Sequence, residues 1–263
     1  MKISIIGCGN MGGAIAAGLA SDHVFASNNT ISASNRTAPK LDKLRERHPN
    51  VETTTVNSES ALGADIIIVA VKPWLIDTVA ADILPAVRDN KIIVSVVAGV
   101  PIEHLREIFS TPSGTPTIFR AIPNTAISIG ESMTVIAHNG ASEEQVDTVV
   151  DIFARLGKAS VIEERLMGAA TALCSCGTAY ALRYVRAAVE GAVELGLYPH
   201  QAQEIVAQTV KGAVMLLDKN GTHPEAEIDR VTTPGGITIK GLNRMEACGF
   251  TNAVVEGLKA SVK

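Results

Sequence analysis

Short apolar runs alternate with helical patterns through the first half of the chain. The runs that predict strands are Ile3–Ile6, Thr30–Ser34, Asp65–Val71, Lys91–Val97, Thr117–Ile122 and Met133–Ala137. Helices are predicted at Asn10–Ala20, which is rich in Ala, and at Trp74–Val87, which has helical spacing. The run Asp65–Val71 is apolar on both faces, as is typical of a strand buried in a parallel sheet. This alternation predicts a doubly wound α/β domain.

The pattern changes after about Ile162. Just before it, Ser142 and Gln145 form a capping-box pattern, so we expect a helix that runs to about Leu156 and stops at Gly157. Beyond Ile162 only helices are predicted: one long helix over Met167–Leu195, a second over Gln201–Leu217, and two shorter ones between Asp229 and the end. We therefore expect an α/β domain over residues 1–162 and an all-α domain over residues 163–263.

Composition adds a constraint on the second domain. Apolar residues make up 46% of the 263 residues but aromatic residues only 3%, so the core must be aliphatic. An all-α domain with so few large side chains would have a thin core, and dimerisation through it is the expected remedy. The net charge of −4, without any Lys/Arg cluster, argues against nucleic-acid binding, and no apolar run is long enough to span a membrane. The four cysteines lack zinc spacing, so we expect no metal site and a cytoplasmic protein with reduced thiols.

The glycine pattern after the first strand points to a cofactor. Gly7, Cys8, Gly9, Asn10, Met11 and Gly12 read G-x-G-x-x-G between a strand and a helix. In the dinucleotide-binding fold, the first Gly allows a tight turn, the second lets a pyrophosphate approach, and the third lets the helix pack against the sheet. The free N–H groups and positive end of the helix would face the phosphates.

The end of the second strand favours NADPH. A site for NADH usually has Asp or Glu there, but this chain has Ser34, Asn35 and Arg36. The Arg36 guanidinium can pair with a 2′-phosphate, which a carboxylate would repel. NADH remains the alternative cofactor.

Two later stretches need a reason beyond packing: Arg120–Thr125 and Asp229–Leu242. In the second, Thr232 and Thr233 precede Pro234, which is expected to start a helix, and two glycines follow. The glycines expose N–H groups that can hold an anion such as a small carboxylate. An ordinary capped turn is the alternative interpretation.

With these residues in view, the chain resembles the pyrroline-5-carboxylate reductase family. The resemblance extends over nearly the whole chain, and its most specific part runs from Thr232 to Phe250. It implies reduction of the cyclic imine Δ1-pyrroline-5-carboxylate to L-proline with NAD(P)H, the last step of proline synthesis. It also implies a Rossmann domain for the cofactor and an all-α domain that forms a homodimer, which some members assemble into a decamer of five dimers.

The resemblance also assigns residues. It implies a substrate-binding set of Glu164, Thr233, Gly235, Gly236, Ile237 and Thr238, in which the Thr238 hydroxyl donates to the ring nitrogen and is the catalytic group. It implies cofactor contacts at Gly7–Gly12, Ser34, Asn57, Val71, Lys72 and Ala98. The predicted cofactor-binding set also includes Asn35 and Arg36, from the end of the second strand, and Ala70 and Pro73, which flank Val71 and Lys72. The segment Cys174–Thr178 departs from the usual Ser-Gly-Ser-Gly-Pro of the family, as do Arg230, where Asn is common, and Ala126, where Pro is common.

Two other functions would fit part of the sequence. A β-hydroxyacid dehydrogenase shares the domain plan but needs a Lys on the long interdomain helix, and this chain has none between Lys158 and Lys211. A non-catalytic NADPH sensor would keep Gly7–Gly12 but would not need the Thr233–Thr238 loop. The preference among imines of different ring size stays open.

Overall fold

The computed structural model describes residues 1–262. They form two compact units, Met1–Ser175 and the residues from Cys176 onward. The division expected from the sequence, after residue 162, falls directly behind the last strand, and the segment 163–175 belongs to the first unit in the structure. No helix in the described part of the chain is long and apolar enough to cross a membrane.

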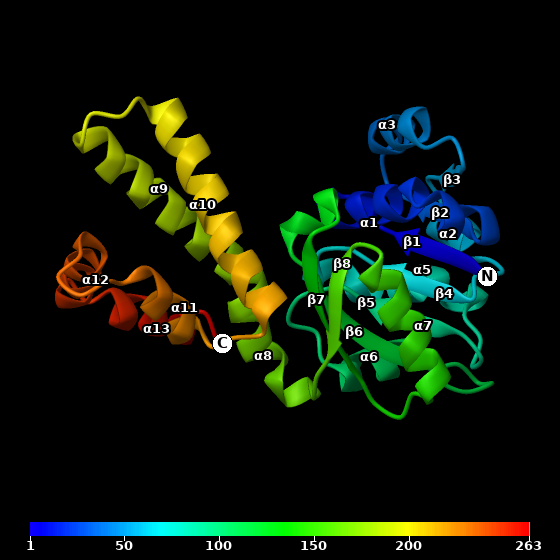
Figure 1. Cartoon of the computed structure of the whole chain (residues 1–263). Helices are drawn as coiled ribbons and strands as arrows, with labels where there is room; N and C mark the ends of the chain where they lie inside the picture. The colour runs from blue at the N-terminus through cyan, green and yellow to red at the C-terminus, as the bar shows by residue number, and fades with distance from the viewer. Residues whose placement is uncertain (263) are drawn as a thin grey trace. The chain divides into compact units, whose positions relative to one another are not determined.

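The strands of the first unit form one sheet in the order β3-β2-β1-β4-β5-β6-β7-β8 (Figure 1). Neighbouring strands are parallel except β6 and β7. The strand β1 lies between β2 and β4, so the strand order reverses there, which is where α/β sheets bind ligands. The bounds are β1 Lys2–Ile6, β2 Thr30–Ser34, β3 Val51–Thr54, β4 Ile66–Val69, β5 Ile92–Ser95, β6 Thr117–Ile122, β7 Ser132–His138 and β8 Gly157–Val161.

Helices cover both faces of this sheet because alternate residues of the buried strands point to opposite sides. In β4, Ile66 and Ile68 belong to one apolar cluster and Ile67 and Val69 to the other. The first cluster receives α1 Asn10–Ser21, α2 His23–Asn28, α3 Ala38–Arg47 and α7 Glu143–Ala154. The second receives α4 Asn57–Ala61, α5 Ile76–Ile83, α6 Ile102–Ile108 and α8 Met167–Ala170. The doubly wound prediction is confirmed.

Several predicted elements keep their predicted bounds, whereas others are shorter. The strands Thr30–Ser34 and Thr117–Ile122 are confirmed residue for residue. The helix predicted over Trp74–Val87 is wrong in extent, because α5 covers only Ile76–Ile83 between two 3₁₀ turns, η1 Pro73–Leu75 and η2 Leu84–Ala86. Proline explains why α5 ends at Ile83, since Pro85 has no N–H to continue the helical hydrogen bonds.

The end of α7 corrects another prediction. The capping box is confirmed: Ser142 and Gln145 exchange hydrogen bonds at the start of the helix. Gly157, however, is not its stop, because α7 ends at Ala154 and Gly157 opens β8. A Cβ on Gly157 would lie 2.1 Å from the carbonyl oxygen of Ser132, so glycine is needed where β8 meets β7. The strand β8 was not predicted.

The second unit is all-helical, as predicted. Its helices are α9 Gly177–Glu194, α10 Pro199–Asn220, α11 Pro224–Val231, α12 Ile237–Ala247 and α13 Phe250–Ala260, and α9 and α10 lie side by side (Figure 1). The long helix predicted over Met167–Leu195 is present as an unbroken helical run to Glu194, but a π-helical segment, Thr171–Cys176, interrupts its α-helical pattern between α8 and α9. The π-helix overlaps the Cys174–Thr178 segment that departs from the family pattern. Helix α11 was also not predicted.

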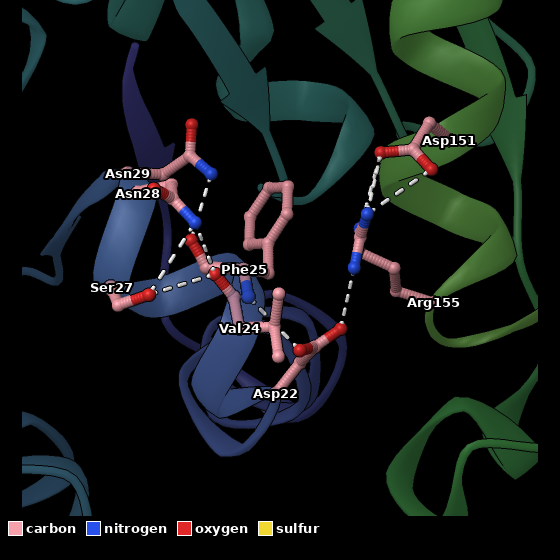
Figure 2. A network of polar contacts seen from close by, with 8 residues as sticks. All are labelled: Asp22, Val24, Phe25, Ser27, Asn28, Asn29, Asp151 and Arg155. Carbon is pink, nitrogen blue, oxygen red and sulfur yellow. Dashed lines mark hydrogen bonds and ion pairs between the residues drawn. The ribbon is translucent and has the colours of Figure 1, made fainter.

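A polar network joins the start of the first unit to α7 (Figure 2). The Asp22 carboxylate accepts the backbone N–H of Phe25 at 3.0 Å, which caps α2, and an Arg155 N–H at 2.7 Å. Arg155 also binds Asp151 and lies 4.6 Å above the Phe25 ring. The hydrogen bond from Phe25 and then that from Arg155 lower the pKa of Asp22 below its ordinary value of 3.8.

We expect Asp22→Ala to lower the free energy of unfolding by about 1 kcal/mol, because it removes a helix cap. A carboxyl group with a lowered pKa in the folded state contributes stability above its unfolded pKa and loses it as the pH falls through the folded pKa. The difference in free energy of unfolding between wild type and variant should therefore be largest at pH 7 and should shrink as the pH falls below about 3.8. Urea titrations along this range measure it. Asp42→Ala, which removes only the exposed pair with Arg45, is the control; an equal loss in both variants would contradict the assignment.

Candidate functional site

The loop between β1 and α1 is held by three glycines in the way the motif predicts. Gly7 has a φ of 97°, and a Cβ there would lie 2.7 Å from a methyl group of Val71 and 2.8 Å from the carbonyl oxygen of Ala70. A Cβ on Gly12 would lie 2.3 Å from the carbonyl oxygen of Gly7. Around Gly9, by contrast, nothing lies within 4 Å of such a Cβ, so its surface is open to a ligand. The cradle therefore fits a pyrophosphate group.

The donors at this cradle come from the helix rather than from the turn. Gly7 and Cys8 both donate their N–H groups to the carbonyl oxygen of Ser34, at 3.0 and 2.9 Å. The first intrahelical bond is the one from Gly13 to Gly9, at 3.0 Å, so the N–H groups of Asn10, Met11 and Gly12 precede the ladder. Neither a capping side chain nor an acidic residue occupies this helix end. The start of α1 is therefore electrostatically suited to an anion.

Cys8 itself is buried in the apolar core. Burial raises the pKa of its thiol to about 12, so the sulfur stays protonated at neutral pH. A cofactor contact at Cys8 would therefore involve its backbone atoms, because the side chain points into the core.

The end of β2 carries a relay of hydrogen bonds. The Ser34 hydroxyl donates to Oδ1 of Asn57 at 2.8 Å, and Nδ2 of Asn57 donates to the Asp82 carboxylate at 2.8 Å. These bonds fix the orientation of the Asn57 amide beside the cradle. Asp82 lies on α5, and its role was missed because nothing in the sequence pattern connects it with Asn57.

Arg36 lies exposed just beyond this relay. Asn35 turns its amide inward to Thr37, at 3.0 and 3.1 Å, whereas Arg36 forms no ion pair with any described residue. Its guanidinium is therefore available to a phosphate group.

The remaining predicted cofactor residues follow the ends of β4 and β5. Ala70, Val71, Lys72 and Pro73 come directly after β4, where Ala70 and Val71 contact the Gly7 turn. Ala98 is exposed in the loop after β5. Because β1, β2, β4 and β5 are parallel neighbours, their carboxyl ends share one edge of the sheet. The structure thus gathers the predicted cofactor set at one edge.

The second unit contains the other predicted loop. Gly235 has a φ of 73°, and Gly236 donates its N–H to the carbonyl oxygen of Thr233 at 2.9 Å. A Cβ on Gly236 would lie 2.6 Å from the Thr233 hydroxyl, so the loop closes only around glycine. The expectation that Pro234 starts the helix is wrong: Pro234 and Gly235 form a turn, and α12 starts at Ile237 after Gly236.

This helix start is also open to an anion. No side chain caps it and no acidic residue lies in its first turn, so its first N–H groups point outward. Thr238 is the second residue of α12, is exposed, and forms no hydrogen bond with any described residue. Its hydroxyl is free to bind a ligand held at this helix end.

Glu164 belongs to the first unit and is held by two donors. Its Oε1 accepts Nη1–H of Arg120 at 2.7 Å and the backbone N–H of Ile102 at 2.8 Å. Asn124, from the same Arg120–Thr125 stretch, donates to the carbonyl oxygen of Cys174 at 3.0 Å, inside the π-helical segment. The stretch singled out in the sequence therefore anchors the segment 164–174 at two points. A role for Arg120 was missed, although a charged residue in the apolar strand Thr117–Ile122 was a signal.

No cluster of His, Cys, Asp and Glu that could bind a metal ion occurs among residues 1–262.

We expect Gly12→Ala to abolish tight binding of a dinucleotide, because the added methyl group would push α1 away from the Gly7 carbonyl oxygen. Gly13→Ala is the matched control, since its Cβ would meet nothing closer than 3.9 Å, and it should bind normally with equal or higher stability. Fluorescence titration with NADPH measures both. Normal affinity in Gly12→Ala would contradict the described cradle.

Comparisons with known proteins agree with this geometry. The family model described as pyrroline-5-carboxylate reductase dimerisation matches residues 164–263, and the one described as NADP oxidoreductase, coenzyme F420-dependent, matches residues 2–99. Pyrroline-5-carboxylate reductase 2 of Dictyostelium discoideum is 38% identical over 100% of this chain and 91% of its own length. Pyrroline-5-carboxylate reductase 1 of the same organism is 40% identical over 98% of this chain, which spans only 48% of that relative.

A solved structure gives the same result. The pyrroline carboxylate reductase of Plasmodium falciparum with NADP bound superimposes with a TM-score of 0.84 at 28% identity and covers 99% of this chain and 95% of its own. The sequence identity to a reductase over the full length of this chain, together with the loops Gly7–Gly12 and Thr233–Thr238, leads to one conclusion. The chain belongs to the pyrroline-5-carboxylate reductase family.

Proposed function

We propose that this chain reduces Δ1-pyrroline-5-carboxylate to L-proline with NAD(P)H, as the last step of proline synthesis, in the cytoplasm. The observation that carries the proposal is the open start of α12, where the uncapped N–H groups of the first turn lie beside the Thr238 hydroxyl. A small cyclic imino acid has a carboxylate for the helix end and a ring nitrogen for the hydroxyl. The similarity to full-length reductases supports the same activity.

We assign cofactor binding and substrate binding to different parts of the chain, as the sequence predicts. Residues 1–162 bind the dinucleotide, and residues 163–263 supply the substrate-binding and dimerisation residues, of which the segment 163–175 packs with the first unit. The cofactor set is Gly7–Gly12, Ser34, Asn35, Arg36, Asn57, Ala70–Pro73 and Ala98, and the substrate set is Glu164, Thr233 and Gly235–Thr238. NAD(P)H supplies the hydride when it is bound.

The protein's own contribution is positioning and proton transfer. The first N–H groups of α12 bind the substrate carboxylate, and the Thr238 hydroxyl donates to the lone pair that forms on the ring nitrogen as hydride adds to the imine carbon. A protonated imine accepts hydride at its carbon and becomes a secondary amine, so the site needs no strong side-chain acid. Alignment of this kind contributes about 7 to 11 kcal/mol in ideal cases.

The active form is at least a homodimer. Helices α9 and α10 expose apolar side chains that a single unit leaves uncovered, including Leu182, Tyr184, Ile205, Val214 and Met215. A cavity of about 530 Å³ in the same unit is lined by Tyr180, Tyr184, Met245, Phe250 and Val254, among others. A second copy of this unit buries such a surface, and a decamer of five dimers is the larger assembly to distinguish from a dimer.

The activity is tested by following NADPH oxidation with pyrroline-5-carboxylate, with a six-membered cyclic imine in parallel. We expect rapid turnover of the five-membered imine. NADPH binding without turnover of either imine would favour the sensor interpretation instead.

Arg36→Ala should raise KM for NADPH at least tenfold and leave KM for NADH within about twofold, because only the 2′-phosphate distinguishes the two cofactors. Steady-state kinetics with both cofactors measure the ratio. Arg47→Ala, an exposed change at the end of α3, is the control. An equal loss with both cofactors would contradict the role of Arg36.

Thr238→Ala should lower kcat by about 10²- to 10⁴-fold without abolishing turnover, because general acid assistance is of this size. Thr238→Ser should retain most of the rate, since it keeps the hydroxyl. Affinity for NADPH should not change in either variant. Full turnover in Thr238→Ala would remove the hydroxyl from the mechanism.

A further inference from the structure

The ion pair between Arg120 and Glu164 has a geometry that points to a role beyond packing. Arg120 lies in β6 between the buried residues Phe119 and Ala121, and only 11% of its side chain is exposed. Two donors, Nη1–H of Arg120 and the N–H of Ile102, hold the same oxygen of Glu164, Oε1. Oε2 receives no hydrogen bond from any described residue. The carboxylate is therefore fixed through one oxygen and open at the other.

Stability alone does not account for this arrangement. The cost of removing two charges from water offsets much of the attraction in a buried ion pair, so an apolar pair of similar volume is often as stable. Arg120 also leaves its Nε–H buried without a hydrogen-bond partner among the described residues, which is unfavourable. Apolar side chains on β6 would avoid both costs.

The position of the pair connects it with the cofactor edge. In the sheet, Arg120 pairs with Ser95, the last residue of β5, and the loop that follows contains Ala98. Ile102, the second donor to Glu164, is the first residue of α6, directly after that loop. Glu164 thus lies beside the loop that leads from the predicted cofactor contact at Ala98 into α6.

We propose that Arg120 is a positioning residue of the reductase, which acts by holding Glu164 so that its Oε2 is presented to the ring nitrogen of the substrate. The inference rests on the proposed function, in which Glu164 belongs to the substrate set. The ring nitrogen is cationic in the protonated imine and in the product, and a carboxylate oxygen is its natural acceptor. Without Arg120, Oε1 keeps a single donor and the carboxylate is no longer fixed in one orientation.

The test is a double-mutant cycle on kcat/KM for pyrroline-5-carboxylate, with Arg120→Gln, Glu164→Gln and the double variant. We expect each single variant to lose about 10- to 100-fold in kcat/KM, and the double variant to be no worse than the poorer single variant within threefold, because Arg120 acts through Glu164. The dissociation constant of NADPH, measured by fluorescence titration, should stay within twofold in all three.

The neighbouring pair Arg165–Glu163 is a matched control. It has the same residue types and the same 2.7 Å separation, but its side chains are 70% and 65% exposed. Arg165→Gln and Glu163→Gln should leave kcat/KM unchanged. If Arg120→Gln does not fold, Arg120→Lys replaces it, and it should retain more activity than Glu164→Gln because it keeps a charged donor.

Three results would overturn the inference while wild type is active: unchanged kcat/KM in Arg120→Gln, additive losses in the double variant, or losses that match a weaker NADPH affinity. An inactive wild type would instead refute the proposed function, and the role of Arg120 with it. The two failures are therefore distinguishable.

Discussion

Helix α1 approaches the turn before it so closely that only hydrogen fits between them. A Cβ on Gly12 would lie 2.3 Å from the Gly7 carbonyl oxygen and 3.0 Å from the Cβ of Ala70. This approach brings the start of α1 to the point where the strand order reverses between β2, β1 and β4. The ends of β2, β4 and β5, which carry Ser34, Ala70 and Ala98, then border the same helix end. The candidate cofactor site depends on this one contact.

In the second unit, glycines likewise shape the loop in front of an open helix start. Its loop needs Gly235 for a positive φ and Gly236 for the approach of the Thr233 hydroxyl, and it delivers an uncapped helix end. Both units thus offer backbone N–H groups at a helix start with no carboxylate in the first turn. A dinucleotide and an imino acid both carry negative charge, so both suit such ends. In the proposed site, Arg36 and Glu164 are the charged side chains to which we assign the recognition of a specific group.

The sequence predicted features that are local and strongly patterned. These features are the buried strands, the capping box at Ser142 and the glycine turn. Each depends on residues that are only a few positions apart in the sequence. It failed where tertiary contacts decide: Gly157 looks like a helix stop but serves the contact between β7 and β8. The relay from Ser34 through Asn57 to Asp82, and the bonds of Arg120 and Asn124 to the segment 164–174, join residues 23 to 50 positions apart. No periodicity connects such residues, so only the fold reveals them.

The proposed reaction is a direct transfer of hydride from the nicotinamide to the imine carbon. The most direct measurement uses NADPH with both hydrogens at C4 of the nicotinamide replaced by deuterium, pyrroline-5-carboxylate and the purified chain, with the product analysed by mass spectrometry and NMR. We expect proline that carries one deuterium, located on the former imine carbon. Proline without deuterium, or oxidation of the cofactor without proline, would contradict it.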